Sequence, residues 1–280
     1  MEILDIRQTH EWGNFLKALG WESVYFKDGD NEVAVRVKKL PLTSIIKVQR
    51  PNELTPKLIA EIRRIGRDNR AFLTKLEPRQ NSSLDQIIAA KFKLDSWPLS
   101  APKTIILDLT ISPEERLKLM SKDGRYCLRQ AQKNLEQLKD SLRIDVLKNP
   151  SANNIADFYK IFTLTAKANH FWVPSLSEIT AKAQAFGDSC QIFLASENNE
   201  PLAGAMVLST GTHAFYLHAA STPRAQELEL PYAIIWKILE TLKAQGFVSL
   251  DLEGIYDERY ANLTKKWQKF TVFKRFWPRP

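Results

Sequence analysis

The chain has 280 residues, 44% of them hydrophobic and 26% charged, and its formal net charge is +8. This composition is typical of a folded globular protein, with room for one large domain or two small ones. No apolar run approaches the roughly 20 residues of a membrane-spanning helix. The basic balance fits a phosphate-rich partner or an anionic membrane surface, although a merely basic surface would give the same value.

Cysteine and histidine residues are few and form no recognisable set. Cys127 and Cys190 are interpreted as reduced thiols of a cytosolic protein rather than as a disulfide. The four histidines form no cluster with metal-ligand spacing, so we expect no metal site.

The first half of the chain is predicted to run helix, hairpin, strand, helix, strand. The opening helix has a helical apolar period and ends at Gly20. Asp28-Gly29-Asp30-Asn31 is typical of a hairpin turn, and Pro56 suits the first turn of the second helix. The expected elements are 9–19, 23–27, 33–37, 45–49, 55–68 and 71–76.

A joining region follows, in which Ser112-Pro113-Glu114-Glu115 combines a helix cap, a first-turn proline and a capping-box glutamate. The next helix has a basic face formed by Arg125, Arg129, Gln132 and Lys133. We expect helices at 81–92, 112–120 and 124–141, and a strand at 104–109.

The second half repeats the order of the first: helix, hairpin, strand, proline-opened helix, closing strand. We infer an internal duplication of one α/β unit, with coincidence between two ordinary α/β segments as the alternative. This order also resembles the GNAT acyltransferase fold. The expected elements are 143–147, 155–168, 191–195, 202–209, 213–220, 232–245 and 247–252.

The loop 221–230 lacks the features that a CoA-dependent enzyme of this fold needs. Backbone N–H groups must approach the diphosphate of CoA there, and glycines let them do so. Arg224 is present, but no glycine follows it before the next helix. Glu227 and Glu229 would repel a diphosphate, and Pro231 removes a donor. We therefore expect no CoA and no other cofactor.

The C-terminal stretch 259–280 holds seven basic residues and no acidic one, with aromatic residues interleaved. Cations neutralise phosphate and aromatic rings stack on bases, as single-stranded RNA ends require. The alternative is a last strand, 269–276, that buries alternate residues. Both can hold together, and Lys274 would then be suited to stabilising an oxyanion.

Six segments in the same order resemble motifs of the FemAB family of peptidoglycan interpeptide-bridge peptidyltransferases. Among them, Asp108 ends a strand in a D-L-S/T-like motif, and Lys274 stands in a closing F-K-x-x-F-like motif. The segments are Pro102–Thr110, Arg125–Lys133, Tyr216–Ser221, Pro231–Trp236, Asp251–Ile255 and Phe273–Phe276.

The resemblance implies an α/β (α+β) fold of two tandem GNAT-like subdomains, each a mixed sheet with flanking helices, at 1–141 and 142–280. It implies an aminoacyltransferase that moves an amino acid from aminoacyl-tRNA to the stem peptide of a UDP-linked or lipid-linked muropeptide. Such an enzyme would be a monomer in the cytoplasm, in some cases at the inner face of the cell membrane.

The resemblance suggests some site residues, and the positions of charged residues beside the predicted strands suggest others. Lys274 would stabilise the tetrahedral intermediate or the 3′ end of the tRNA. Asp108 would contact the acceptor amine or act as a general base, with turn capping as its alternative. Lys47 and Arg50 could hold a diphosphate, or could be surface charges. Tyr216, Tyr232 and Tyr256 are expected to bind substrate, with core packing as the alternative for Tyr216 and a simple loop aromatic as the alternative for Tyr256. The expected tRNA-binding residues are Lys265, Lys266, Lys269 and Arg275.

Two other functions fit the same residues. One is an N-acyltransferase of GNAT type that uses a CoA or carrier-protein thioester. The other is a non-catalytic module that binds tRNA or a membrane on an inactive acyltransferase frame.

Overall fold

The computed structural model describes residues 4–79, 84–93, 99–101, 103–254 and 274–276. The chain forms two compact units, Met1–Lys103 with Phe276–Pro280, and Thr104–Arg275. Among the described residues, no helix has the length and apolar character needed to cross a bilayer.

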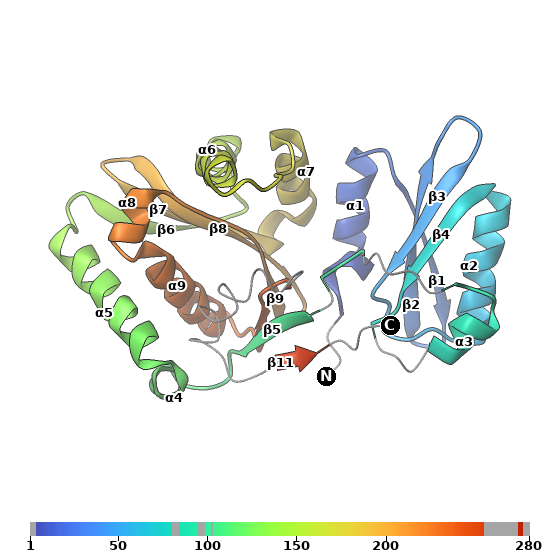
Figure 1. The fold of residues 1–280 in the computed structure, drawn as a ribbon, viewed down its shortest axis with the longest axis horizontal. Coiled ribbons are helices and arrows are strands. Elements are labelled where there is room, and N and C mark those ends of the chain that lie inside the picture. Colours follow the sequence, from blue (N-terminus) through green and yellow to red (C-terminus); the bar gives the residue numbers. More distant parts are fainter. Residues whose placement is uncertain (1–3, 80–83, 94–98, 102, 255–273, 277–280) are drawn as a thin grey trace. The chain divides into compact units, whose positions relative to one another are not determined.

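The first unit is a four-stranded sheet in the order β1-β2-β3-β4 (Figure 1). The first two pairs are antiparallel, and β3 pairs with β4 in parallel. A parallel pair needs a crossover, and helix α2 between β3 and β4 supplies it. The elements are η1 (Ile6–Gln8), α1 (His10–Ala18), β1 (Glu22–Asp28), β2 (Asn31–Lys39), β3 (Ser44–Gln49), α2 (Pro56–Asp68), β4 (Ala71–Glu77) and α3 (Leu84–Ala89).

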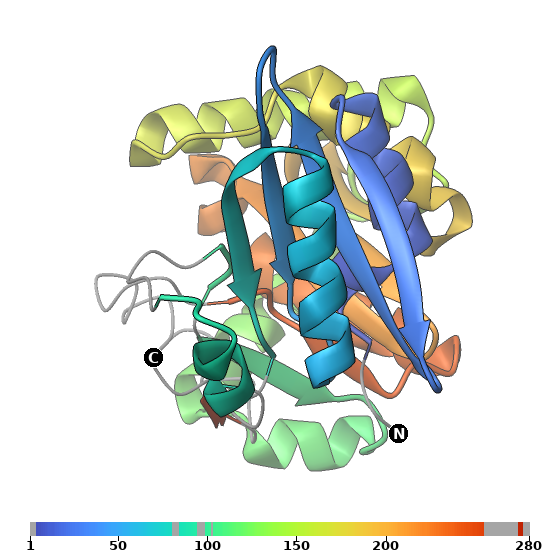
Figure 2. The same cartoon turned by 90° about the vertical axis from the view of Figure 1, so that its right-hand side faces the viewer.

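Helix α2 covers one face of this sheet (Figure 2). Thr55 caps the helix by accepting a hydrogen bond from the backbone N–H of Leu58, and Pro56 opens it. Leu58, Ile62 and Ile65 recur on the buried side of α2. They belong to one buried cluster with the valines of β2 and with Ile46 and Val48 of β3, and burying each such side chain contributes about 1.5–3 kcal/mol.

The second unit contains a seven-stranded sheet in the order β11-β5-β10-β9-β8-β7-β6. Its β9–β10 pair is parallel, whereas β6–β7, β7–β8, β8–β9 and β5–β10 are antiparallel. The strands are β5 (Lys103–Asp108), β6 (Leu142–Lys148), β7 (Cys190–Glu197), β8 (Glu200–Thr210), β9 (His213–Ser221), β10 (Ser249–Asp251) and β11 (Lys274–Phe276). The helices are α4 (Pro113–Leu119), α5 (Lys122–Gln137), α6 (Ala152–Asn169), α7 (Leu176–Phe186), η3 (Gly187–Ser189), α8 (Pro223–Glu227) and α9 (Leu230–Ala244).

The two units repeat one topology. In each, two antiparallel pairs lead to a third strand, a crossover helix and a parallel fourth strand, as β1-β2-β3-α2-β4 and as β7-β8-β9-α9-β10. A helix precedes the first strand in both units. The predicted tandem GNAT-like α/β fold is confirmed. Helices α7 and α8 were not predicted from the sequence.

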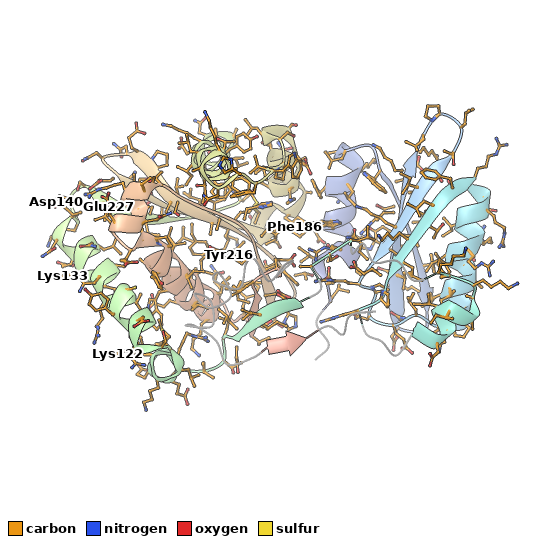
Figure 3. The ribbon with its side chains drawn as sticks, in the orientation of Figure 1. Lys122, Lys133, Asp140, Phe186, Tyr216 and Glu227 are labelled. Atoms are coloured by element: carbon orange, nitrogen blue, oxygen red, sulfur yellow. The ribbon has the colours of Figure 1, made fainter. Side chains whose placement is uncertain are left out.

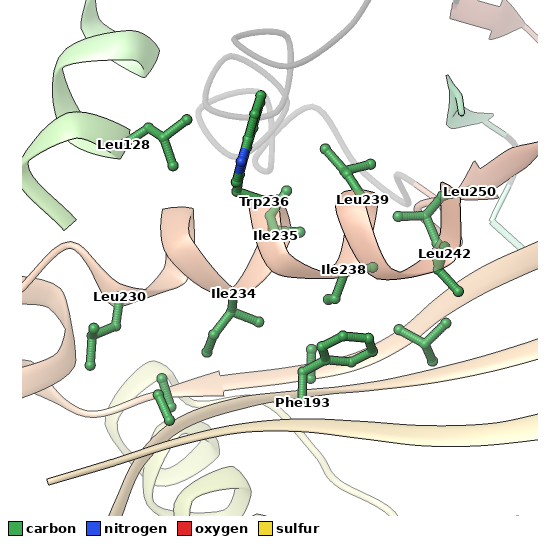
Figure 4. Close-up of a cluster of buried hydrophobic side chains, with 14 of the residues drawn as sticks. Leu128, Phe193, Leu230, Ile234, Ile235, Trp236, Ile238, Leu239, Leu242 and Leu250 are labelled. Atoms are coloured by element: carbon green, nitrogen blue, oxygen red, sulfur yellow. The ribbon is translucent and has the colours of Figure 1, made fainter. Parts of the chain in front are cut away.

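The core of the second unit lies beneath α9 (Figure 4). Ile234, Ile238 and Leu242 of α9 belong to the same buried cluster as Phe193 of β7. On the other side of α9, Leu128 of α5 joins this cluster. Contacts therefore group α4 and α5 with the second unit, whereas the sequence grouped them with the first.

Candidate functional site

A row of polar side chains crosses the sheet of the first unit. From β1 to β4 its members are Ser23, Arg36, Lys47 and Lys75, each paired with the next. Directly paired residues share one face of a sheet. The residues on either side of Arg36 belong to the core beneath α2, so the row lies on the opposite face. The sequence identified only Lys47 from this row.

Lys47 is half-buried within the row. Its Nζ lies 4.4 Å from the ring centroid of Trp21. Burial, followed by the charges of Arg36 and Arg7, lowers the pKa of Lys47 to about 8. A bound phosphate group would favour the protonated amine again, because a nearby opposite charge stabilises the charged form.

Arg36 is buried and held in one position. Its Nη1 donates to Tyr25 Oη at 2.6 Å, and its Nη2 donates to the carbonyl oxygens of Arg7 and Thr9, each at 2.9 Å. Arg36 Nε and Ser23 Oγ are buried and have no hydrogen-bond partner within the described ranges. Buried polar groups normally have a hydrogen-bond partner, so these two groups could each donate a hydrogen bond to an oxyanion or a water.

Arg50 occupies a different environment from Lys47. It follows β3 with a φ of 50° and is buried. Its Nη1 lies 3.3 Å from Asp5 Oδ2, and its Nη2 donates to the carbonyl oxygen of Ala101 at 2.6 Å. Burial alone would raise the pKa of Asp5, but Arg7 and Arg50 lower it below the usual value. Arg50 thus takes part in a buried ion pair.

In the second unit, β9 and β10 separate after three residue pairs. The last pair joins Phe215 to Asp251, whereas β9 continues to Ser221. Glu253 N donates to Asp251 Oδ1 at 2.8 Å, and Glu253 and Gly254 have φ values of 57° and 109°. This turn ends β10. Within the described residues, the sheet is therefore open beside the second part of β9.

A β-bulge in β9 begins where the sheet opens. Val207 of β8 pairs with Tyr216 and Met206 pairs with His218, which leaves Leu217 as an extra residue. Residues two apart in a regular strand share a face. The bulge breaks this rule, because Tyr216 packs on the core beneath α9 while His218 contacts α6 and α7 on the other face.

Tyr216 and Tyr232 both pack against the core beneath α9 (Figure 3 labels Tyr216). Burial raises the pKa of Tyr216 well above its usual value. The pKa of Tyr232 is raised by burial first, and then by Cys127, Glu229 and Asp123. Both phenols stay protonated at neutral pH, so their chemistry is hydrogen-bond donation rather than proton abstraction.

The buried Lys182 and the half-buried His218 form a pair that the sequence did not indicate. Lys182 Nζ lies 3.1 Å from His218 Nε2, and the ring of Phe162 lies 5.2 Å from that of His218. Burial and then the charge of Lys182 lower the pKa of His218 well below its usual value. The imidazole is therefore neutral at pH 7. Lys182 lies on α7, which was itself missed.

Asp108 ends β5 and caps the turn that follows. Its Oδ1 accepts hydrogen bonds from the N and the Oγ1 of Thr110 at 2.8 and 2.6 Å. The guanidinium of Arg116 donates to the carbonyl oxygen of Asp108. These contacts match the turn-capping alternative, and contact with an acceptor amine stays a prediction.

Lys274 and Arg275 lie in β11, the strand beside β5, which ends in Asp108. Only the backbone of β11 belongs to the described part of the chain. The other predicted tRNA- and substrate-binding residues lie outside the described residues, namely Tyr256, Lys265, Lys266 and Lys269.

The segment expected to lack a CoA clamp forms the short helix α8. The N–H of Ala225 donates to Thr222 Oγ1, and those of Gln226, Leu228 and Glu229 donate to backbone carbonyls. The Nε and Nη2 of Arg224 donate to the two carboxylate oxygens of Glu197, both at 3.1 Å. These four N–H groups and the guanidinium of Arg224 are engaged within the chain, so a CoA diphosphate could bind them only if these contacts opened.

A family model described as an acetyltransferase (GNAT) domain matches residues 122–262. No curated protein matches the chain.

Several solved structures share the fold. FemX superposes with a TM-score of 0.78 at 15% identity, over 96% of this chain and 89% of FemX. A conserved protein of unknown function from Bacteroides thetaiotaomicron gives 0.63 at 10% identity, over 96% and 90% of the two chains. The C-terminal domain of a putative lysylphosphatidylglycerol synthetase from Agrobacterium fabrum gives 0.59 at 13%, over 95% and 86%. The similarity to FemX confirms the expected FemAB-like fold.

Proposed function

Because the chain belongs to the acetyltransferase (GNAT) domain family, we propose that it is an acyltransferase whose donor is aminoacyl-tRNA rather than acyl-CoA. Its acceptor would be an amine on the stem peptide of a peptidoglycan precursor. It would act in the cytoplasm without a cofactor.

The observation that carries this proposal concerns segment 221–230, where a CoA-dependent enzyme of this fold would bind the diphosphate. In this chain, backbone donors of that segment are already hydrogen-bonded within the protein. Four N–H groups of 225–229 donate within the chain, and Glu197 and Glu227 hold Arg224. Opening these contacts would sacrifice several hydrogen bonds, each worth about 1 kcal/mol. A donor without a CoA diphosphate avoids this cost. The FemX-like fold and the six FemAB-like motifs favour a charged tRNA as that donor.

The proposed step is attack of the acceptor amine on the ester carbonyl of the aminoacyl-tRNA. A C–N bond forms and the ester C–O bond breaks. The ribose oxygen leaves with the electron pair and takes the proton that the amine loses. The ester is already activated, so the protein mainly positions the reactants and stabilises the developing oxyanion. We assign oxyanion stabilisation to Lys274, with Tyr216 and Tyr232 as neutral donors.

The cationic row of the first unit supports a diphosphate-bearing acceptor. Lys47 is flanked by the charges of Arg36 and Arg7, and the row keeps two buried polar groups without partners in the described ranges. UDP-linked and lipid-linked precursors both carry a diphosphate, so this row suits either. Arg50 would act indirectly, since it shares the carboxylate of Asp5 with Arg7.

Transfer of a radiolabelled amino acid from charged tRNA to a muropeptide tests the proposal. Lys274→Ala should lower kcat at least a hundredfold, because loss of one oxyanion donor typically costs that much. Lys139→Ala, on the exposed surface of the second unit, is the control. Absence of transfer with every common charged tRNA, on both UDP-linked and lipid-linked acceptors, would refute the proposal.

The family model also keeps a second candidate open, an N-acyltransferase that uses a CoA thioester. Acetyl-CoA at a hundred times its Kd would stabilise such an enzyme by about 2.7 kcal/mol. A rise in melting temperature with acetyl-CoA that corresponds to this free energy, together with acetyl transfer to an amine, would favour this candidate over the tRNA-dependent one.

A further inference from the structure

The outer surface of α5 carries a line of cationic and aromatic side chains. Residues at i, i+4, i+7 and i+11 lie along one side of a helix, and the rise of 1.5 Å per residue makes the line about 16 Å long. Its members, the α5 stripe, are Lys122, Tyr126, Arg129 and Lys133, and all are exposed. Figure 3 shows Lys122 and Lys133 along α5, on the side of the unit away from the sheet.

The cations of the α5 stripe have no carboxylate partner among the described residues, unlike several other exposed cations of the chain. Lys57, Lys139 and Lys160 each pair with a carboxylate, those of Asp28, Glu136 and Glu200. Within the described ranges, none of the three stripe cations lies within 4.0 Å of a carboxylate oxygen. The acidic residue at the far end, Glu136, is already held by Lys139 at 3.4 Å. The stripe therefore presents three cations without an ion-pair partner in the part of the chain that the structure describes, with the carboxylate of Asp123 next to Lys122 in sequence.

The opposite side of α5 is packed against the rest of the second unit. Leu128 and Ala131 are buried in the core of the second unit, and α5 packs on α9. A membrane-surface helix inserts a free apolar face into the bilayer, and α5 has none to offer. The stripe instead sets an exposed ring, Tyr126, between cations. This combination suits a nucleic-acid backbone, whose phosphates attract cations and whose bases or sugars contact rings.

We propose that the α5 stripe binds the phosphate backbone of an RNA. The proposal rests on the proposed function to the extent that this RNA is the body of the donor tRNA. The stripe would then hold the tRNA at a surface separate from the reacting ester and would set affinity rather than the rate of the chemical step.

The test uses the full chain and a fluorescent RNA hairpin with a single-stranded 3′ end, followed by anisotropy across a salt series. The variant combines Lys122→Ala, Arg129→Ala and Lys133→Ala. The matched control combines Lys57→Ala, Lys139→Ala and Lys160→Ala, which removes the same charge from ion-paired positions. Each phosphate contact contributes about 0.7–0.9 to the slope of log affinity against log salt. The stripe variant should therefore lose about two to three slope units and bind at least tenfold more weakly.

The control should bind within threefold of wild type, and both variants should keep the wild-type melting temperature. Equal binding by the stripe variant and wild type, or no RNA binding by wild type, would overturn the inference. The inference would also be overturned if the stripe variant lost binding to phosphatidylglycerol vesicles but kept wild-type RNA binding. A membrane would then be the partner of the stripe. RNA binding through the stripe without aminoacyl transfer would leave this inference standing and overturn only the proposed function. If transfer occurs, the stripe variant should raise KM for charged tRNA and leave kcat unchanged.

Discussion

The ammonium of the buried Lys182 of α7 lies 3.1 Å from Nε2 of His218, a half-buried residue of the bulged strand β9. Burial, and then the positive charge of Lys182, lower the pKa of His218, so the imidazole is neutral and can accept the hydrogen bond. The pair fixes the imidazole on the face opposite Tyr216, at the point where the sheet opens.

This pair predicts a loss of stability in acid. The folded state lowers the pKa of His218 from its ordinary 6.5, so below that pH the unfolded state binds more protons. The stability contribution is complete above pH 6.5 and falls with decreasing pH, by at most about 1.4 kcal/mol per pH unit. Chemical denaturation at pH 7.5, 6.5 and 5.5 measures it.

His218→Gln keeps an acceptor for Lys182 but cannot take up the proton, so its stability should depend less on pH. His10→Gln is the control, because the side chain of His10 is 66% exposed. If His218→Gln and wild type show the same pH slope, the pair does not govern this acid sensitivity.

Lys47 predicts proton uptake on ligand binding. With a pKa of about 8, half of the free protein lacks this proton at pH 8. A bound diphosphate raises the pKa again, so binding of a UDP-linked muropeptide should take up protons near pH 8 and weaken as pH rises. Calorimetry in buffers of different ionisation enthalpy measures the uptake.

Lys47→Met should abolish this proton uptake and weaken binding about ten- to a hundredfold, since a charge-assisted hydrogen bond contributes about 1.5–3 kcal/mol. Stability at pH 7 should not fall, because removal of the half-buried charge relieves its desolvation. Lys57→Met, which removes an exposed lysine, is the control. Unchanged proton uptake in Lys47→Met would show that the diphosphate binds elsewhere.

Gly13 of α1 lies close to the side chains of Tyr25 in β1 and Arg36 in β2. A Cβ at this position would clash with Tyr25 Oη and lie 2.7 Å from Arg36 Nη1. Gly13→Ala should therefore lower the free energy of unfolding, although alanine favours a helix by about 1 kcal/mol. Adding Tyr25→Phe removes the clashing oxygen and should restore part of the loss. Denaturant unfolding of wild type, both single variants and the double variant gives the coupling, and additive effects would contradict this geometry.

Local signals in the sequence predicted most elements well. Thr55 with Pro56 and Ser112 with Glu115 locate helix starts, because caps act over three residues. Helix α7 was not predicted because its buried side is not uniformly apolar. Besides Ile179 and Phe186, it contains Lys182 and the small residue Ala183. A lysine on the buried side breaks the apolar period on which such predictions depend.

The candidate sites were harder to predict because they depend on register. Lys47 could be named from its strand, but its neighbours Arg36 and Lys75 lie 11 and 28 residues away in sequence and meet it only through strand pairing. Likewise, no local pattern shows that an extra residue at Leu217 places Tyr216 and His218 on opposite faces.

The most direct test of the account is single-turnover transfer, with purified protein, charged tRNA and a muropeptide acceptor, assayed beside acetyl-CoA with the same acceptor. The account predicts that the amino acid appears on the acceptor amine in an amide bond, that Lys274→Ala loses this product, and that acetyl-CoA gives none. Acetylated acceptor with acetyl-CoA, and no aminoacylated product from any charged tRNA, would contradict it.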